Sequence, residues 1–278
     1  MSRWFLGELI GTFLLVFFGC GVVATAVALE APVGLFQVAI VWGLGLTVAI
    51  FITAKASGAH FNPAITLAFA LIRDFPKERV LGYFSAQFLG AFLAAAVVYT
   101  LFGGSIRSFE ERNDIVRGTT GSEASAMIFG EYFPNPGGKA LTAEKRESVS
   151  LPTAMLAEAL GTALLALAIF AFTHRENNKG PGPMTPLAIG LTLTTLICIF
   201  APLSMAGFNP ARDLAPRLFS SLAGWGGHPF AVNGMGWLLV YVLSPCIGAP
   251  VGAWVADRLF APEVQEEVTS LQPATPKA

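Results

Sequence analysis

Two related stretches determine how this chain folds: Ser57-Gly-Ala-His-Phe-Asn-Pro-Ala64 and Gly207-Phe-Asn-Pro-Ala-Arg-Asp213. Each places Asn-Pro-Ala before about ten residues that we expect to be helical, over 65–72 and 212–220. Asn is a favoured N-cap, and Pro suits the first helical position because its missing N–H would have no partner there. A helix of about ten residues is about 15 Å long, half of the ~30 Å hydrocarbon core of a bilayer. Neither helix can therefore cross a membrane.

Long apolar runs surround both stretches. Of the 278 residues, 54% are hydrophobic and 13% are charged, whereas a soluble domain has about 25% charged residues. A helix that crosses a bilayer needs about 20 mostly apolar residues. The sequence predicts six such spans, at about 5–28, 34–54, 80–103, 153–173, 183–202 and 234–257.

The two short helices lie between these spans, with no room for an ordinary excursion at the surface. We therefore expect each to dip in from one face and to end at the midplane. Non-helical backbone at that depth is tolerated where protein buries it or where it lines a wet cavity. The predicted fold class is an all-α membrane protein with six transmembrane helices, two re-entrant half-helices and a pore.

An internal repeat organises the chain. The motif Glu8-Leu-Ile-Gly-Thr12 recurs as Glu158-Ala-Leu-Gly-Thr162, in the same order and at nearly the same spacing as the two Asn-Pro-Ala motifs. The repeats cover about 1–103 and 150–258, and each contains three spans. Because three is odd, the second copy enters the membrane from the opposite side. Such inverted repeats place the solute site near the midplane, between the two halves.

The remaining segments complete a single transmembrane domain over 1–278. A long loop, 104–152, joins the repeats, and the tail 262–278 is expected to be disordered. Short loops with Lys and Arg, at 73–79 and 174–180, alternate with loops that have none. The positive-inside rule then places both termini in the cytoplasm.

Charge and cysteine content exclude other classes. A net charge of −1 argues against a nucleic-acid partner, which would require a basic excess. The three cysteines, Cys20, Cys198 and Cys246, all lie in apolar segments, so the sequence predicts no metal site. It also shows no nucleotide-binding loop or catalytic triad, and we predict neither a cofactor nor an enzyme.

The paired Asn-Pro-Ala motifs and the Glu-x-x-Gly-Thr repeat resemble the major intrinsic protein (aquaporin) family. The resemblance extends over nearly the whole chain, to about residue 260. It implies an aquaporin-like fold with one pore per protomer, in a homotetramer. It also implies a plasma-membrane location in contact with the lipid bilayer, which would be the inner membrane in a bacterium.

The residues around the half-helices receive pore roles in this interpretation. The positive ends of both helices would meet at the midplane and repel cations. The amides of Asn62 and Asn209 would donate to passing oxygens. The resemblance makes Glu8 and Glu158 buried acceptors for the loop N–H groups. The complete set of motif residues is Asn62, Pro63, Ala64, Asn209, Pro210 and Ala211, with loop support from Glu8, His60, Glu158 and Asp213.

A selectivity filter follows from the same resemblance. An intramembrane arginine is costly and usually functional, and Arg212 matches the filter arginine of the family. Trp42 matches the filter tryptophan of members that conduct glycerol, and Ile197 occupies the position where water-selective members have histidine. Ala206 replaces the second aromatic residue that is usual in glycerol facilitators. The predicted filter is Trp42, Ile197, Ala206 and Arg212.

The favoured function is a passive aquaglyceroporin for glycerol-type polyols and water that excludes ions and protons. A water-selective aquaporin and a nodulin-like channel for neutral metalloid hydroxides or ammonia remain open. A coupled secondary transporter is the alternative from another class, because such transporters also use inverted repeats and broken helices.

Overall fold

The computed structural model describes residues 1–261 and is helical, without strands, over that range. Six of its helices are long and apolar enough to cross a membrane. They are α1 (Arg3–Val27), α2 (Leu35–Ser57), α4 (Val80–Arg112), α7 (Leu151–Phe172), α8 (Thr185–Ser204) and a sixth that runs over Gly236–Leu259. This sixth helix consists of α11 (Gly236–Leu238), a π-helical turn (Leu239–Leu243) and α12 (Ser244–Leu259). The six predicted spans are confirmed. The tail 262–278 lies outside the described residues.

Helix α4 is longer than the predicted span 80–103, because it continues to Arg112. The apolar run ends near residue 106, which set the predicted boundary. The helix continues because its last turns are packed: Glu110 is buried and accepts a hydrogen bond from Ser125 Oγ at 2.8 Å. The segment after the helix therefore holds its charged end in place.

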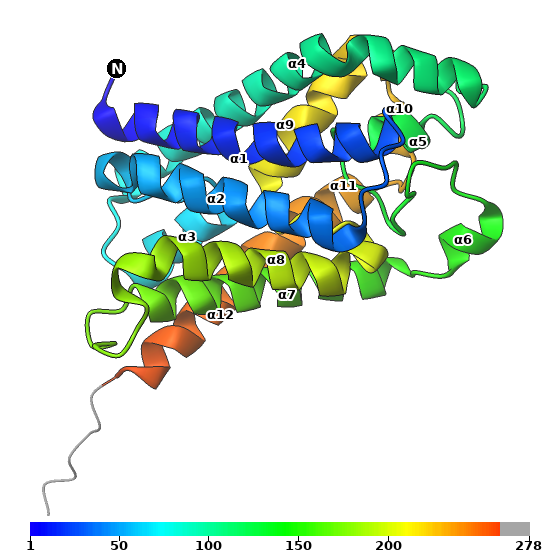
Figure 1. Ribbon diagram of the computed structural model, residues 1–278. Helices are drawn as coiled ribbons and strands as arrows, with labels where there is room; N and C mark the ends of the chain where they lie inside the picture. The colour runs from blue at the N-terminus through cyan, green and yellow to red at the C-terminus, as the bar shows by residue number, and fades with distance from the viewer. Residues whose placement is uncertain (262–278) are drawn as a thin grey trace, which may run out of the picture.

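The two Asn-Pro-Ala motifs begin two short helices, α3 (Pro63–Ile72) and α9 (Pro210–Ser220). Each starts at its proline, two residues before the predicted boundary. The side chain of Asn62 accepts a hydrogen bond from Ala64 N at 2.9 Å. Asn209 caps α9 in the same way, accepting from Ala211 N at 3.0 Å. In Figure 1, α3 and α9 lead from the interior of the bundle toward opposite ends.

Glycines allow the long helices to approach closely in equivalent pairs. A Cβ at Gly90 of α4 would lie 2.3 Å from the carbonyl oxygen of Leu9 in α1. In the second half, a Cβ at Gly248 of α12 would lie 2.0 Å from the carbonyl oxygen of Ala159 in α7. The same backbone contact thus joins the first and third spans of each half.

The segment between the halves packs against one end of the bundle. It contains α5 (Glu123–Ala126) and α6 (Ala143–Glu147) and lies beside α10 (His228–Ala231) (Figure 1). The indole of Trp225 is fully buried and donates to Ser125 Oγ at 3.0 Å. The guanidinium of Arg117 lies 3.9 Å from the centre of the Trp225 ring. These contacts anchor the segment over the mouth of the bundle.

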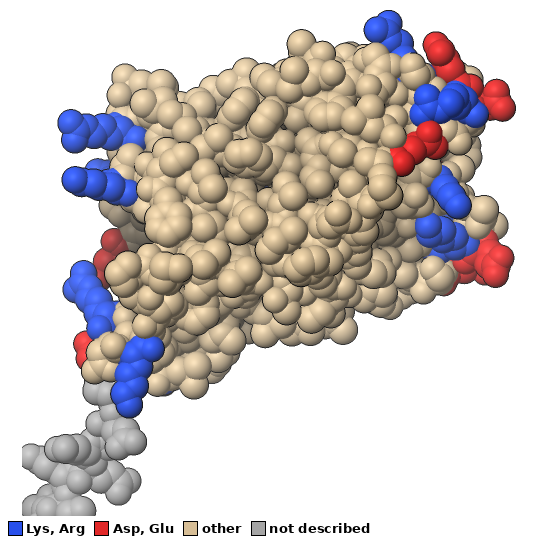
Figure 2. Space-filling model, in the orientation of Figure 1, with Lys and Arg blue, Asp and Glu red and all other residues tan. Residues whose placement is uncertain are grey.

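The charged side chains lie at the two ends of the molecule, and the band between them is nearly uncharged on the visible face (Figure 2). Large apolar side chains are exposed along this band. They include Phe36, Phe51, Ile52, Leu81, Leu101, Leu156, Ile199, Ile247 and Trp254. Exposed apolar surface of this extent is unfavourable in water and favourable in lipid. Together with the six apolar helices, it makes the chain a multi-pass membrane protein.

Candidate functional site

The N-terminal ends of α3 and α9 meet inside the bundle, and each binds the loop of the other half. Asn62 Nδ2 donates to the carbonyl oxygen of Phe208 at 2.7 Å. Asn209 Nδ2 donates to the carbonyl oxygen of Phe61 at 2.8 Å. Each amide nitrogen carries two hydrogens, so these bonds leave one N–H of each asparagine for another acceptor. Both asparagines line an internal cavity.

Two buried carboxylates hold the loops that lead into the half-helices. Glu8 accepts the backbone N–H groups of residues 60 and 61, at 3.0 and 2.7 Å. Glu158 accepts those of residues 207 and 208, at 2.9 and 2.6 Å. Both side chains are fully buried. Each carboxylate thus compensates two N–H groups that the non-helical backbone would otherwise leave without a partner.

These loops contain strained backbone. Ala59, Phe61, Met205, Ala206 and Phe208 all have φ between 52° and 64°. Residues with a Cβ rarely adopt this region, and each such conformation costs about 1–3 kcal/mol. Strain of this kind persists where the surroundings determine the conformation, and the two carboxylates supply that constraint.

His60 lies in the first loop and faces the internal cavity. Its ring is stacked on Phe69, with centroids 4.4 Å apart. Its Nδ1 lies 3.1 Å from Thr66 Oγ1. These contacts fix the ring against α3.

Two cavities adjoin inside the bundle, and the inner one contains the two asparagines; we call the place where their linings overlap the constriction. The inner cavity, of about 250 Å³, is lined by Asn62, Asn209 and His60. The outer cavity, of about 440 Å³, opens toward the segment between the halves. Four residues line both cavities: Trp42, Ile197, Met205 and Arg212.

The constriction contains three of the four residues predicted for the filter. The guanidinium carbon of Arg212 lies 4.2 Å from the centre of the Trp42 ring, and Ile197 completes the wall. The fourth, Ala206, lines the inner cavity but not the outer one. Met205 is an addition that sequence reasoning missed: its sulfur accepts Tyr132 N at 3.2 Å. The direction of the Met205 side chain depends on the positive φ of its backbone. A methionine in the sequence gives no indication of that conformation.

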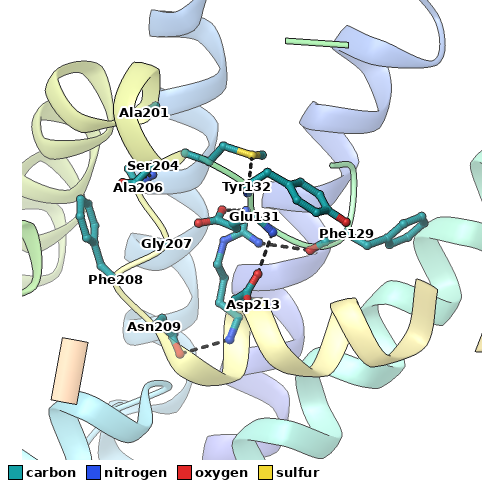
Figure 3. Close-up of polar contacts among 12 residues, drawn as sticks. Phe129, Glu131, Tyr132, Ala201, Ser204, Ala206, Gly207, Phe208, Asn209 and Asp213 are labelled. Atoms are coloured by element: carbon teal, nitrogen blue, oxygen red, sulfur yellow. Dashed lines mark hydrogen bonds and ion pairs between the residues drawn. The ribbon is translucent and has the colours of Figure 1, made fainter. Parts of the chain in front are cut away.

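A cluster of charges surrounds Arg212, and Figure 3 shows two of its members, Glu131 and Asp213. Glu131 Oε1 lies 2.6 Å from Arg212 Nη2, and both side chains are buried. Asp213 accepts Glu131 N at 2.7 Å and also pairs with Arg217 Nη2 at 2.8 Å. Sequence reasoning missed Glu131, which belongs to a segment without periodicity. Its one signal was its place directly before the aromatic pair 132–133.

A further buried carboxylate, Glu123, anchors the outer segment. It accepts Leu141 N at 2.9 Å, pairs with Arg146 at 3.0 Å and lies 2.9 Å from His228 Nε2. Burial raises the pKa of the Glu123 carboxyl, but the bonds from His228 and Leu141 and the charge of Arg146 outweigh it. The pKa therefore lies below its ordinary value, and Glu123 is a charged anchor.

Within residues 1–261, no three His, Cys, Asp or Glu side chains are grouped so that they could hold a metal ion. The polar groups along the two cavities include the amides of Asn62 and Asn209, the guanidinium of Arg212 and the carboxylate of Glu131.

The family model described as major intrinsic protein matches residues 1–256. The chain belongs to the major intrinsic protein family. It is 40% identical, over 251 residues, to a glycerol uptake facilitator protein of Pseudomonas aeruginosa, covering 89% of this chain and 85% of that protein. It is 37% identical, over 280 residues, to a glycerol uptake facilitator protein of Escherichia coli, covering 98% and 95%.

Two further similarities extend this family assignment. A propanediol uptake facilitator, PduF, of Salmonella typhimurium is 37% identical over 249 residues, which are 88% of this chain and 89% of that protein. The X-ray structure of the aquaglyceroporin from Plasmodium falciparum matches with a TM-score of 0.78 and 26% identity, covering 93% of this chain and 96% of that one. The family fold is therefore present over nearly the whole chain.

Proposed function

We propose that this protein is a passive channel that conducts glycerol-type polyols and water across a membrane and excludes ions and protons. The observation that carries the proposal is the pair of cavities that meet at Trp42 and Arg212 and reach the two asparagine amides. The related proteins named glycerol and propanediol uptake facilitators support the choice of solute.

The chemistry of the path suits an uncharged hydroxylic solute. Arg212 offers N–H donors to a solute oxygen, and the face of Trp42 offers apolar contact to the carbon chain beside it. Farther in, the free N–H groups of Asn62 and Asn209 continue the line of donors. Because the positive ends of α3 and α9 meet there, a desolvated cation is repelled while a neutral polyol is not.

The width of the filter favours polyols over water alone. Ile197 places an aliphatic side chain where a histidine would add a second polar group, and Ala206 leaves space in the inner cavity beside it. Glu8, Glu158, His60 and Asp213 each make fixed contacts with the loops or with α9. We assign them to support of the pore, not to coupling with a proton or sodium gradient.

We propose a plasma-membrane homotetramer with both termini in the cytoplasm. At the end of the molecule that carries the N-terminus (Figure 1), the visible charged side chains are mainly basic, whereas the other end mixes basic and acidic ones (Figure 2). Positive charge favours the cytoplasmic side. The bacterial relatives favour the inner membrane. Chemical cross-linking in native membranes tests the tetramer.

Stopped-flow light scattering on proteoliposomes tests the function. Vesicles with the protein should shrink and then reswell in hyperosmotic glycerol much faster than empty vesicles, without any ion gradient. Fast water movement with background glycerol entry would establish a water-selective channel. Glycerol entry that requires a proton or sodium gradient would establish a coupled transporter and refute the proposal.

A further inference from the structure

The groups along the proposed pore are mostly positive. The amino ends of α3 and α9 each carry about half a positive charge, and both face the inner cavity. Arg212 adds a full positive charge where the two cavities meet. These charges repel cations, but on their own they would attract small anions. A negative group beside these charges would oppose the entry of anions.

Glu131 is the carboxylate that faces Arg212. It is 1% exposed, and its Oε1 lies 2.6 Å from Arg212 Nη2. Asp213 does not compensate Arg212, because both of its oxygens bind Arg217. Among the described residues, Glu131 is therefore the ion-pair partner of Arg212.

The segment that contains Glu131 is also anchored without its carboxylate. The segment is held through the backbone of Glu131: its N–H donates to Asp213 at 2.7 Å, and its carbonyl oxygen accepts from Arg217. Neither carboxylate oxygen has a hydrogen bond of regular geometry within residues 1–261. The side chain lines the outer cavity.

The second half of the chain leaves space for this carboxylate. A Cβ at position 207 would lie 2.4 Å from Glu131 Oε2, so an alanine there would displace it. Gly207 lies in the loop between Ala206 and Asn209, and Figure 3 shows Glu131 between that loop and Asp213. The carboxyl group of Glu131 is thus built into the wall beside the constriction.

We propose that Glu131 excludes small inorganic anions by cancelling the charge of Arg212 at the junction of the two cavities. The inference rests on the proposed channel function, because it assigns a selectivity role within that pore. With the pair intact, the constriction carries no net charge and retains the donors that a neutral solute needs. Without the carboxylate, the guanidinium and the two helix ends form a continuous positive path.

The test is nitrate entry into proteoliposomes that contain Glu131→Gln. Vesicles are mixed with hyperosmotic potassium nitrate in the presence of valinomycin, so that potassium follows and reswelling reports nitrate entry. The matched control is Glu144→Gln, which makes the same charge change at an exposed position of α6. We expect Glu131→Gln to admit nitrate at least tenfold faster than the control, and tenfold corresponds to about 1.4 kcal/mol in the barrier. Glu131→Asp keeps the charge and should exclude nitrate as the unaltered protein does.

Water and glycerol permeability are measured in the same vesicles. If the unaltered protein does not conduct glycerol, the proposed function fails, whatever nitrate does. If glycerol passes and Glu131→Gln admits no more nitrate than Glu144→Gln, the role of Glu131 is refuted and the channel function stands. Should Glu131→Gln misfold, Glu131→Ser is expected to give the same nitrate entry. Loss of water permeability in both neutral variants would also overturn the proposal, because the carboxylate would then hold the pore open.

Discussion

Replacing Gly161 by alanine is expected to damage conduction far more than stability. Gly161 lies in α7 against the ring of Phe208, and a Cβ there would lie 2.0 Å from a ring carbon. Non-bonded carbons approach to about 3.5 Å, so the ring must retreat by about 1.5 Å. Phe208 precedes Asn209, and its carbonyl accepts from Asn62 at 2.7 Å.

The stability change is the difference of two opposing effects. Overpacking a core costs about 1–3 kcal/mol, whereas alanine is about 1 kcal/mol better than glycine inside a helix. We expect a net loss of about 1 kcal/mol in the free energy of unfolding. Displacement of the Asn209 amide should lower glycerol flux about tenfold. That loss requires about 1.4 kcal/mol in the barrier, which lies within the ~1–3 kcal/mol of one disrupted buried hydrogen bond.

Stopped-flow glycerol uptake and thermal unfolding in detergent measure the two effects. Gly21→Ala in α1 is the matched control, because no described atom lies within 4 Å of its Cβ. That variant should gain about 1 kcal/mol and conduct normally. Gly11→Ala, whose Cβ would lie 1.9 Å from the ring of Phe61, should behave like Gly161→Ala. The reasoning is refuted if Gly161→Ala conducts glycerol normally and is stabilised as Gly21→Ala is.

Three further predictions concern the filter and the outer segment. Arg212→Val leaves Glu131 as an unpaired charge at the constriction, so proteoliposomes should lose proton exclusion in a pH-jump assay; unchanged exclusion would make Arg212 structural. The double change Ile197→His with Ala206→Cys should reduce glycerol flux more than water flux in stopped flow, and equal losses would mean that the filter is misplaced. Because the pKa of Glu123 is lowered in the folded protein, its contribution to stability is present above the unfolded pKa and is lost as pH falls through the folded pKa. Thermal unfolding across acidic pH should show that loss, and Glu123→Gln should remove this part of the pH dependence.

The fold could be predicted from the sequence because local rules determine it. Six apolar runs have the length of a bilayer core, and Asn62-Pro63 and Asn209-Pro210 carry the capping signal of a helix start. The internal repeat indicates that each half contains one such asparagine and one buried glutamate that supports its loop. These signals depend on residues that are neighbours in sequence or equivalent in the two halves.

The rest of the site depends on contacts between distant segments. Glu131 and Arg212 are 81 residues apart, and the segment around Glu131 has neither periodicity nor a copy in the other half. Met205 reaches the constriction because its backbone has φ of 64°, a conformation that depends on Glu158 and on the loop around it. The end of α4 was missed because hydropathy stops at the lipid boundary, whereas the helix continues.

The crossed asparagine bonds also bear on how the protein is made. Asn62 donates to the carbonyl of Phe208, and the carbonyl of Phe61 accepts from Asn209. In both bonds the second partner is synthesised almost 150 residues after the first. A nascent chain whose first three helices have entered the bilayer thus lacks half of the wall and both crossing bonds. The two crossing bonds, and the part of the wall that they hold, can therefore form only after residues 208 and 209 have been synthesised.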